Sequence, residues 1–209
     1  MNTNSLADQD VIDALRQTFS HDMNTDLARL RTGLTSAAEK TGMLDVSYRT
    51  VDSPIGRLLL AATPTGLVRV AFACEDHDDV LASLAETISP RIMFASARFD
   101  DVCRQFDEYF QRRRDRFEVQ LDLQLVKGFR RTVLGHLLEV RYGHTASYAE
   151  LARLSGNAAA VRAAASACSH NPLPVIVPCH RIIRTDGSIG KYLGGVEAKH
   201  LLLTLERGS

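Results

Sequence analysis

Residues 171–181 read Asn-Pro-Leu-Pro-Val-Ile-Val-Pro-Cys-His-Arg, and this stretch is the most informative in the 209-residue chain. Its first asparagine and prolines are typical of a turn, and the apolar run at 174–177 is typical of a short strand that enters a core. The sequence therefore predicts that the Cys179 thiol lies at the end of a buried strand. A buried cysteine is most often an inert packing residue, so a small apolar side chain is the alternative to a nucleophile.

A histidine, His180, directly follows this thiol. A free thiol has a pKa near ~8.5, so it needs a base or a cation to become a thiolate at neutral pH. Neighbouring residues on a strand point to opposite faces, so His180 would reach the Cys179 proton only from a turn or through one water molecule. A thiolate beside an imidazolium has a depressed pKa, and we expect this of Cys179 if His180 is its base.

A helix-turn-helix pattern precedes this motif. Ser147 with Glu150 three residues later matches a capping box, which predicts a short helix at 148–154. A Ser-Gly-Asn turn follows, and the alanine-rich stretch 158–168 predicts the second helix. Its small side chains would let a partner backbone approach closely, although small residues also serve helix packing inside a core. Arg162 has the length to reach into a duplex.

Residues 129–206 resemble the DNA-binding and active-site domain of the O6-alkylguanine-DNA alkyltransferases, also called methylated-DNA-protein-cysteine methyltransferases. Several separated motifs carry this resemblance. They are Ser147-Tyr148, Arg162, Asn171-Pro172, Pro178-Cys179-His180-Arg181, Gly190 with Tyr192, Gly194-Gly195, Lys199 and Glu206.

The resemblance implies both a fold and an activity. The fold is an α/β N-terminal domain of ribonuclease-H-like type, followed by a mostly α C-terminal domain with a winged-helix-like helix-turn-helix. The activity is the irreversible transfer of an alkyl group from O6-alkylguanine in DNA, and secondarily from O4-alkylthymine, to Cys179. Such a protein works once per molecule and needs no cofactor. It binds double-stranded DNA through the minor groove as a monomer, and it must flip the target nucleotide out of the stack.

The resemblance also assigns roles to individual residues. His180 would take the Cys179 proton through a water, Glu206 would orient the imidazole and Asn171 would hold the turn. Tyr148, assisted by Lys199, would protonate the leaving guanine oxygen. The implied DNA-contacting residues are Arg162, which fills the gap left by the flipped base, with Ala165, Ser166 and Tyr148. The implied substrate pocket consists of Pro174, Ile182, Gly190, Tyr192, Leu193 and Gly194. Each of these residues also has an ordinary explanation when it is taken singly. Tyr192 and Glu206 would then be surface or core residues without a role in the chemistry, and the glycines would lie in ordinary turns.

Four positions depart from the family pattern. The family commonly has glycine at the position of Ala165 or Ser166, and the larger side chains here would weaken or reshape contact with the DNA backbone. Leu193 replaces a small polar residue found in some members, which would narrow the pocket or remove a hydrogen bond to a large adduct. Cys168 adds a thiol on the second helix, which we interpret as packing.

The chain divides into three segments. Apolar residues at spacings of three and four predict that residues 1–44 form a helical N-terminal extension. This extension would serve as a packed appendage, a partner-binding helix pair or a mobile arm. Residues 45–122 form an α/β domain and residues 123–209 the alkyltransferase domain. In the α/β domain we expect strands at 46–51, 57–62 and 67–72, helices at 78–88 and 100–113, and alternation at 117–121. A further helix is expected at 129–140.

The formal charge is zero overall but differs between the two halves. Residues 1–126 hold 14 Lys+Arg and 20 Asp+Glu, whereas residues 127–209 hold 11 Lys+Arg and 5 Asp+Glu. A basic half suggests a polyanionic partner, and solvated surface charge is the alternative. The cluster of three arginines at 112–114 lies among acidic residues, which favours a solvated helix end over a nucleic-acid site.

Composition suggests a cytoplasmic protein. No apolar run approaches the ~20 residues of a membrane span, and the acidic N-terminus is not a signal peptide. The four cysteines lie too far apart for a C-x-x-C metal pattern, so we expect no metal, and structural disulfides are not expected in a reducing compartment.

The same motifs leave two other functions as alternatives. A non-catalytic alkyltransferase-like protein would bind lesions or regulate, keeping the helix-turn-helix and Arg162 but lacking the cysteine. A Cys-His hydrolase would need an oxyanion hole, and no motif indicates one. The presence of Cys179 favours the transferase.

Overall fold

The computed structural model describes residues 30, 33 and 44–208, and the chain divides into two units at 44/45. The predicted N-terminal extension lies almost entirely outside the described residues. The second unit, from Asp45 onward, holds the sheet domain and the helical domain that follows it.

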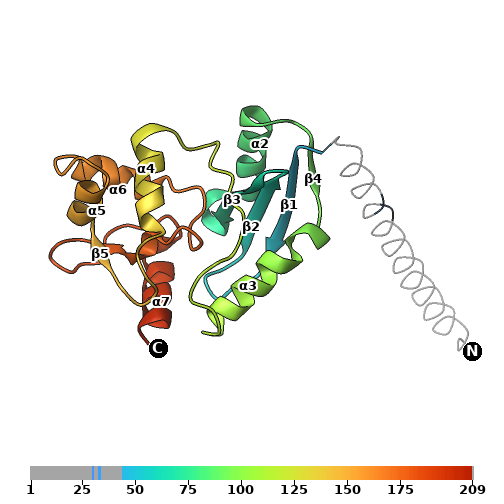
Figure 1. The fold of residues 1–209 in the computed structure, drawn as a ribbon. Helices are drawn as coiled ribbons and strands as arrows, with labels where there is room; N and C mark the ends of the chain where they lie inside the picture. The colour runs from blue at the N-terminus through green and yellow to red at the C-terminus, as the bar shows by residue number, and fades with distance from the viewer. Residues whose placement is uncertain (1–29, 31–32, 34–43, 209) are drawn as a thin grey trace, which may run out of the picture. The chain divides into compact units, whose positions relative to one another are not determined.

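The N-terminal domain is built on a four-stranded sheet in the order β3-β2-β1-β4 (Figure 1). Strands β1 (Val46–Val51), β2 (Leu58–Thr63) and β3 (Gly66–Phe72) form an antiparallel meander. Strand β4 (Ile92–Phe94) pairs with β1 in parallel. The three predicted strands are confirmed to within one residue at each end. The fourth strand was not predicted, because three residues are too few to show a period.

Both faces of this sheet are covered. Helix α2 (His77–Thr87) packs on the face that carries Leu59 and Ala61, while helix α3 (Asp100–Phe110) packs on the face that carries Leu58 and Leu60. Successive residues of a strand point to opposite faces, so a strand buried on both sides is apolar throughout. Two short 3-10 turns, η1 (Ala73–Glu75) and η2 (Ala97–Phe99), precede these helices.

The predicted alternation at 117–121 gives only one isolated bridge. Leu121 pairs with Leu67 at the edge of the sheet, and the rest of the segment forms no strand in the described part of the chain. Helix α3 ends at Phe110 rather than 113, because Arg112 has a positive φ of 58°.

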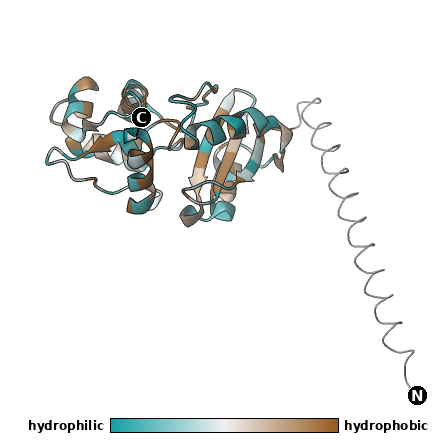
Figure 2. Cartoon of the chain, turned by 90° about the horizontal axis from the view of Figure 1, so that it is seen from below, coloured by the Kyte–Doolittle hydropathy of each residue, from teal (hydrophilic) through white to brown (hydrophobic). Residues whose placement is uncertain are grey.

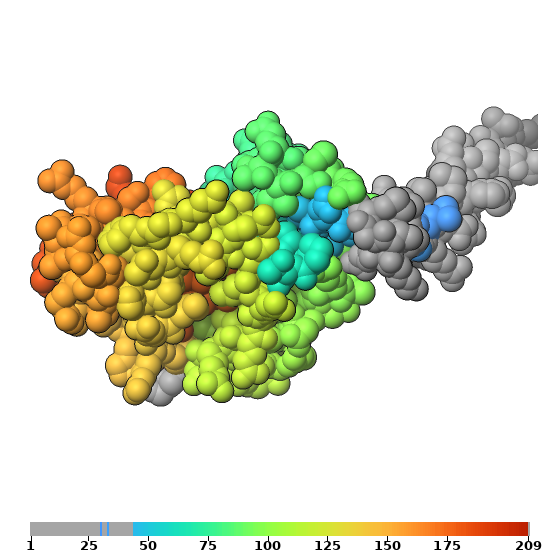
Figure 3. All heavy atoms as spheres, turned by 45° about the horizontal axis from the view of Figure 1, so that its top comes forward, coloured from blue at the N-terminus to red at the C-terminus, as the bar shows by residue number. Residues whose placement is uncertain are grey.

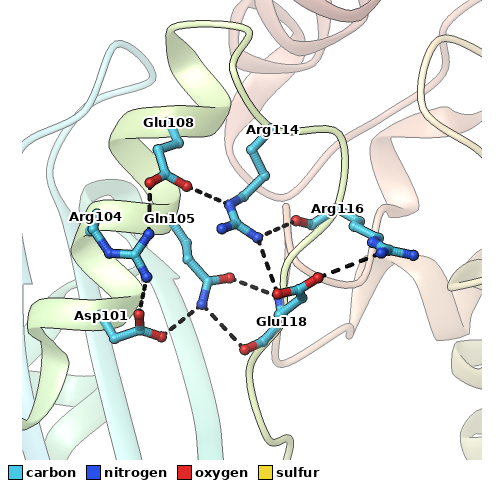
Figure 4. Close-up of polar contacts among 7 residues, drawn as sticks. All are labelled: Asp101, Arg104, Gln105, Glu108, Arg114, Arg116 and Glu118. Carbon is cyan, nitrogen blue, oxygen red and sulfur yellow. Dashed lines mark hydrogen bonds and ion pairs between the residues drawn. The ribbon is translucent and has the colours of Figure 1, made fainter.

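Arg114, the last residue of the arginine cluster after α3, is paired within its own domain (Figure 4), whereas Nη1 of Arg112 donates to the Gly208 carbonyl at 3.3 Å. Nε of Arg114 donates to Glu108 at 2.8 Å, and Nη1 lies 4.0 Å from Glu118. Arg104 pairs with both Asp101 and Glu108. Arg114 is therefore held by carboxylates rather than free for a phosphate, which agrees with the helix-end interpretation.

The C-terminal domain is mostly helical. It contains α4 (Gly128–Leu137), α5 (Tyr148–Leu154), α6 (Val161–Ser169) and α7 (Gly195–Arg207). Two short strands, β5 (Ala146–Ser147) and β6 (Ile182–Ile183), pair in parallel. Each helix contributes buried apolar residues to one core, such as Val133 of α4, Leu151 of α5, Ala164 of α6 and Leu202 of α7. Figure 2 shows hydrophobic and hydrophilic residues mixed along the helices.

The helix-turn-helix consists of α5 and α6. Oγ of Ser147 accepts from the Glu150 backbone N–H at 3.1 Å, and the Glu150 carboxylate accepts from the Ser147 N–H at 3.3 Å. The predicted capping box and the predicted helix at 148–154 are both confirmed. Helix α6 starts at Val161 rather than 158, because Asn157 closes a turn by accepting from Ala159 at 3.1 Å.

The predicted strand at 174–177 is wrong. The segment is a tight turn in which Val175 has a positive φ of 72° and Val177 N–H donates to the Leu173 carbonyl at 2.8 Å. Nδ2 of Asn171 also donates to the Val177 carbonyl at 2.8 Å, so one buried side chain holds the turn closed. A left-handed valine is strained, and the surrounding contacts must hold it in place.

The two domains share one apolar core. Leu58, Phe72 and Phe106 of the first domain belong to the same buried cluster as Leu134 and Leu202 of the second. Val70 of β3 donates its N–H to the Pro172 carbonyl at 2.8 Å, which ties the sheet edge to the turn before Cys179. Figure 3 shows residues of the two domains, coloured cyan to green and yellow to orange, in direct contact.

Gly194, directly before α7, provides a test of this contact. A Cβ at Gly194 would lie 2.5 Å from Cε1 of Phe72, inside van der Waals contact. We expect Gly194→Ala to lower the free energy of unfolding by about 1–3 kcal/mol in urea denaturation. Gly135→Ala on α4 is the matched control, because its Cβ would meet nothing within 4 Å and alanine favours helix. A Gly194→Ala protein as stable as wild type would contradict the close approach.

Candidate active site

Cys179 opens a single 3-10 turn, η3 (Cys179–Arg181), and its side chain is only 2% exposed. The Cys179 N–H donates to the Val177 carbonyl at 2.8 Å, and the Arg181 N–H donates to the Pro178 carbonyl at 3.0 Å. Because the residues lie in a turn, Cys179 and His180 are not forced to opposite faces as they would be on a strand.

Asn171 holds the sulfur as well as the turn. Its Nδ2 lies 3.2 Å from Sγ of Cys179, and its Oδ1 accepts from the Leu173 N–H at 3.0 Å. The same amide thus satisfies three groups in a buried site, and an aliphatic side chain of similar size would leave them unpaired. These contacts fit the role predicted for Asn171, which is to hold the turn before Cys179.

The carboxylate of Glu206, on α7, is the most heavily bonded group of the site. It accepts from His180 Nε2 at 2.9 Å, Tyr109 OH at 2.6 Å, the Gly143 N–H at 3.2 Å, and both Nε and Nη2 of Arg181 at 2.9 Å. Burial by itself would raise the pKa of Glu206, but the hydrogen bonds from His180 and Arg181 lower it to about 2. Glu206 is therefore ionised throughout the neutral range.

His180 is completely buried, and burial lowers its pKa although Glu206 favours the charged form. Its Nε2 faces the carboxylate and so carries the proton of the neutral ring. Its Nδ1 has no hydrogen-bond partner among the described residues. The imidazole is thus neutral, with a free lone pair on Nδ1 that can accept a proton.

The pKa of Cys179 is raised to about 11 rather than depressed. Burial is the main cause, and the hydrogen bond from Asn171 and the charge of Lys199 offset it only in part. The expected thiolate-imidazolium pair is therefore not found at this site, because burial disfavours the charged form of both groups and the charge of Arg181 adds to this effect at His180. The resting site holds a neutral thiol and a neutral imidazole.

Lys199 and Tyr148 lie together beside the thiol. Nζ of Lys199 donates to the Ile182 carbonyl at 2.6 Å and lies 5.9 Å from the centre of the Tyr148 ring. Burial lowers the pKa of Lys199 and raises the pKa of Tyr148 to about 12. The Tyr148 hydroxyl is therefore protonated at neutral pH and available as a donor.

A cavity of about 360 Å³ opens onto the thiol. The predicted residues that line it are Tyr148, Arg162, Ala165, Ser166, Cys179, Gly190 and Tyr192. Five lining residues had no predicted place in the pocket, namely Val161, Cys168, Ser169, Arg184 and Lys191. Gly190 has a positive φ of 70°, and a Cβ there would lie 3.5 Å from the Tyr148 hydroxyl, so glycine keeps this wall open.

Four of the predicted pocket residues lie outside this cavity, as the structure describes it. Pro174 and Ile182 are buried in the core. The Leu193 carbonyl accepts from the Cys74 thiol at 3.5 Å, and Gly194 packs against Phe72. The 193–194 segment faces the N-terminal domain, which sequence spacing does not reveal.

Helix α6 presents its small residues on two sides. Ala164, Ala167 and Cys168 are buried, whereas Arg162 and Ser166 are exposed and Ala165 is half-buried at the cavity. This division follows the 3.6-residue period of a helix. Arg162 forms no ion pair or hydrogen bond with any described residue, so its guanidinium is free.

Two residues of the site had no predicted role. Arg181 was visible within the Pro-Cys-His-Arg motif, yet its two bonds to Glu206 required knowing that the chain returns there. Tyr109 lies in the other domain, and no sequence signal connects it with the site. In the described part of the chain, no group of three or more His, Cys, Asp and Glu could hold a metal ion.

Comparison with known proteins identifies the family. The ribonuclease-like domain of 6-O-methylguanine DNA methyltransferase matches residues 46–123, and the DNA binding domain of the same family matches residues 128–208. The chain belongs to the 6-O-methylguanine DNA methyltransferases. The methylated-DNA–protein-cysteine methyltransferase of Mycolicibacterium paratuberculosis is 38% identical over 162 residues, which cover 78% of this chain and 93% of that protein.

Solved structures agree with this family assignment and with the predicted fold class. The O6-methylguanine methyltransferase of Mycobacterium tuberculosis matches with a TM-score of 0.69 at 35% identity. Mycobacterium tuberculosis OGT in complex with DNA matches with a TM-score of 0.67 at 36% identity. Each comparison covers 78% of this chain and 93% of the other.

The raised pKa of Cys179 has a direct spectroscopic consequence. Because this pKa is about 11, we expect wild type and Cys179→Ser to show equal thiolate absorbance between about pH 7 and 9. The difference should develop only at more alkaline pH, and the remaining cysteines cancel in the comparison. Extra absorbance of wild type that appears below about pH 8 would show a preformed thiolate and contradict the neutral resting site.

Proposed function

We propose that this protein repairs DNA as a methylated-DNA–protein-cysteine methyltransferase whose acceptor is Cys179. The family matches support the activity, and the buried thiol at the base of a cavity beside the helix-turn-helix supports the choice of residue. O6-alkylguanine is the substrate, with O4-alkylthymine as a second one.

The transfer is a displacement at the alkyl carbon. The Cys179 sulfur forms a bond to this carbon as its bond to guanine O6 breaks. Because the thiol and His180 start neutral, the thiol proton must leave as the reaction proceeds, through a water to Nδ1 of His180. Glu206 then stabilises the imidazolium, and Arg181 and Gly143 keep the carboxylate in place.

The leaving guanine needs a proton, and Tyr148 is placed to supply it. Its hydroxyl is protonated at neutral pH, and the nearby Lys199 cation favours the phenolate that forms. The product is a thioether, which no other thiol in the chain can reverse. Each molecule therefore acts once.

Charge distribution supports DNA contact by the C-terminal domain. In the N-terminal domain, seven arginines form ion pairs: Arg49, Arg57, Arg69, Arg91, Arg104, Arg114 and Arg116. From residue 127 onward, Arg181 is the only lysine or arginine paired with a described carboxylate. The cations that remain unpaired, including Arg162, Arg184 and Lys191 at the cavity, are suited to phosphates.

Finer aspects of this proposal rest on the family resemblance. We propose that α6 enters the minor groove, that the protein binds as a monomer and that it is cytoplasmic. The small side chains of Ala165 and Ser166 suit a close approach to DNA. No helix in the described residues is long and apolar enough to cross a membrane.

A second candidate is a lesion-binding or regulatory protein that does not transfer the alkyl group. The same unpaired cations and the same cavity would serve it. The placement of Cys179 within reach of Asn171 and beside His180 favours the transferase, because a binding protein has no need of this arrangement.

Mass measurement after reaction tests the acceptor. We expect incubation with a duplex containing O6-methylguanine to add one methyl group to wild type, located on Cys179 by peptide mapping. Cys179→Ala should add none and still bind the duplex, because phosphate contacts supply most affinity. Cys103→Ser, a thiol of α3 away from the cavity, should react like wild type. Methyl transfer to Cys168 in the Cys179→Ala protein would refute the assignment.

Arg162→Ala tests the proposed flipping role. Flipping costs a few kcal/mol, so we expect single-turnover transfer from duplex DNA to slow by about tenfold or more. Reaction with free O6-alkylguanine base, which needs no flipping, should change little. Arg207→Ala removes the same charge from the end of α7 and controls for general electrostatics. Equal losses on duplex and free base would rule out the role.

A further inference from the structure

One residue of the N-terminal domain extends into the site. Tyr109, on α3, is completely buried, and its hydroxyl donates to Oε1 of Glu206 at 2.6 Å. The ring is fixed by edge and tilted contacts with Phe110, Phe117 and Tyr142, whose centres lie 5.2–6.0 Å away. The position of this hydroxyl is therefore set by aromatic packing from both domains, through Phe110 and Phe117 of the first and Tyr142 of the second.

We infer that Tyr109 is a positioning residue for alkyl transfer, whose hydroxyl draws charge from Glu206 and so keeps His180 neutral and able to accept the Cys179 proton. This inference rests on the proposed function. It also gives the ribonuclease-like domain a part in the chemistry, beyond its role in the shared core.

The main support for this inference is that two hydrogen bonds converge on one oxygen of Glu206. Oε1 of Glu206 accepts both from Tyr109 OH and from His180 Nε2, the latter at 2.9 Å. Hydrogen bonds to a carboxylate share its charge, so a stronger bond from one donor weakens the attraction for another. A carboxylate that served His180 alone would favour imidazolium, which cannot act as a base.

Other groups around His180 also lower its pKa and so favour the neutral ring. Arg181 shares Glu206, and Lys199 of α7 lies close enough for its charge to lower the pKa of His180. The remaining titratable neighbours are Cys179 and Tyr192, whose ring centre lies 6.4 Å from that of His180. Burial and the Glu206 charge raise the pKa of Tyr109 well above 10, so the hydroxyl stays a donor at all relevant pH values.

Tyr109→Phe tests the inference, because it removes the hydroxyl and keeps the ring. We expect the His180–Glu206 bond to strengthen, which should move the His180 ring N–H proton resonance downfield in NMR spectra of the DNA-free protein. The pKa of His180 should rise, so the acid limb of the single-turnover pH-rate profile should shift upward by half to one unit. This shift corresponds to a loss of about three- to tenfold on that limb, with the alkaline plateau unchanged.

A second substitution should act with the opposite sign. Incorporation of 3-fluorotyrosine at position 109 makes the phenol a stronger donor, so the His180 resonance should move upfield. The matched control is Tyr142→Phe, which removes a hydroxyl of the same aromatic cluster that bonds the Leu205 carbonyl at 3.4 Å and not Glu206. This control should leave the resonance and the pH profile unmoved.

The NMR shift and the pH-rate profile together distinguish a positioning role of Tyr109 from a packing role. An unmoved resonance in Tyr109→Phe, or a rate lowered by one factor at every pH, would show that Tyr109 is only a packing residue. Resonance shifts of the expected signs in proteins that transfer no methyl group, wild type included, would support the contact with Glu206 and refute the proposed function instead. Thermal unfolding of each variant confirms that the measurements are made on folded protein.

Discussion

The buried carboxylate of Glu206 is the interaction on which the rest of the site depends. It accepts hydrogen bonds from α3 through Tyr109, from the turn before β5 through Gly143, and from η3 through His180 and Arg181. Removing one partner of a buried ion pair typically costs about 3–5 kcal/mol, because the other charge is left unpaired. Glu206 thus fixes the helical domain, its turn and the sheet domain at one point.

This arrangement also determines the chemistry available at rest. With Arg181 and Tyr109 sharing the carboxylate, burial dominates at His180 and at Cys179, and both groups are neutral. A protein that reacts once with its substrate gains from a protected thiol, because an exposed thiolate would be open to oxidation and to other electrophiles. The Cys179 thiol and Tyr148, the proposed acid, line the cavity that the substrate would enter, and His180, the proposed base, lies buried next to the thiol in η3.

Local sequence signals were reliable where the structure they predict is also local. The capping box of Ser147 and Glu150 correctly predicted the start of α5. The short apolar runs separated by turn residues correctly predicted the three strands of the meander. The turn before Cys179 has the apolar content typical of a strand, so sequence alone predicts extended structure there. The side-chain bonds of Asn171 and the contact between β3 and Pro172 hold it as a turn instead.

The sequence alone determined the family and indicated the residues proposed for the site, since Asn171, Cys179, His180 and Arg162 stand in motifs with fixed spacing. Only the tertiary structure decided the charge state of the thiol, the place of Arg181 and the contribution of Tyr109. The reason is physical. A pKa depends on burial and on every nearby charge, and these come from segments that lie 25 to 97 residues from Glu206 and on its own helix. Spacing within a motif contains no information about such distant partners.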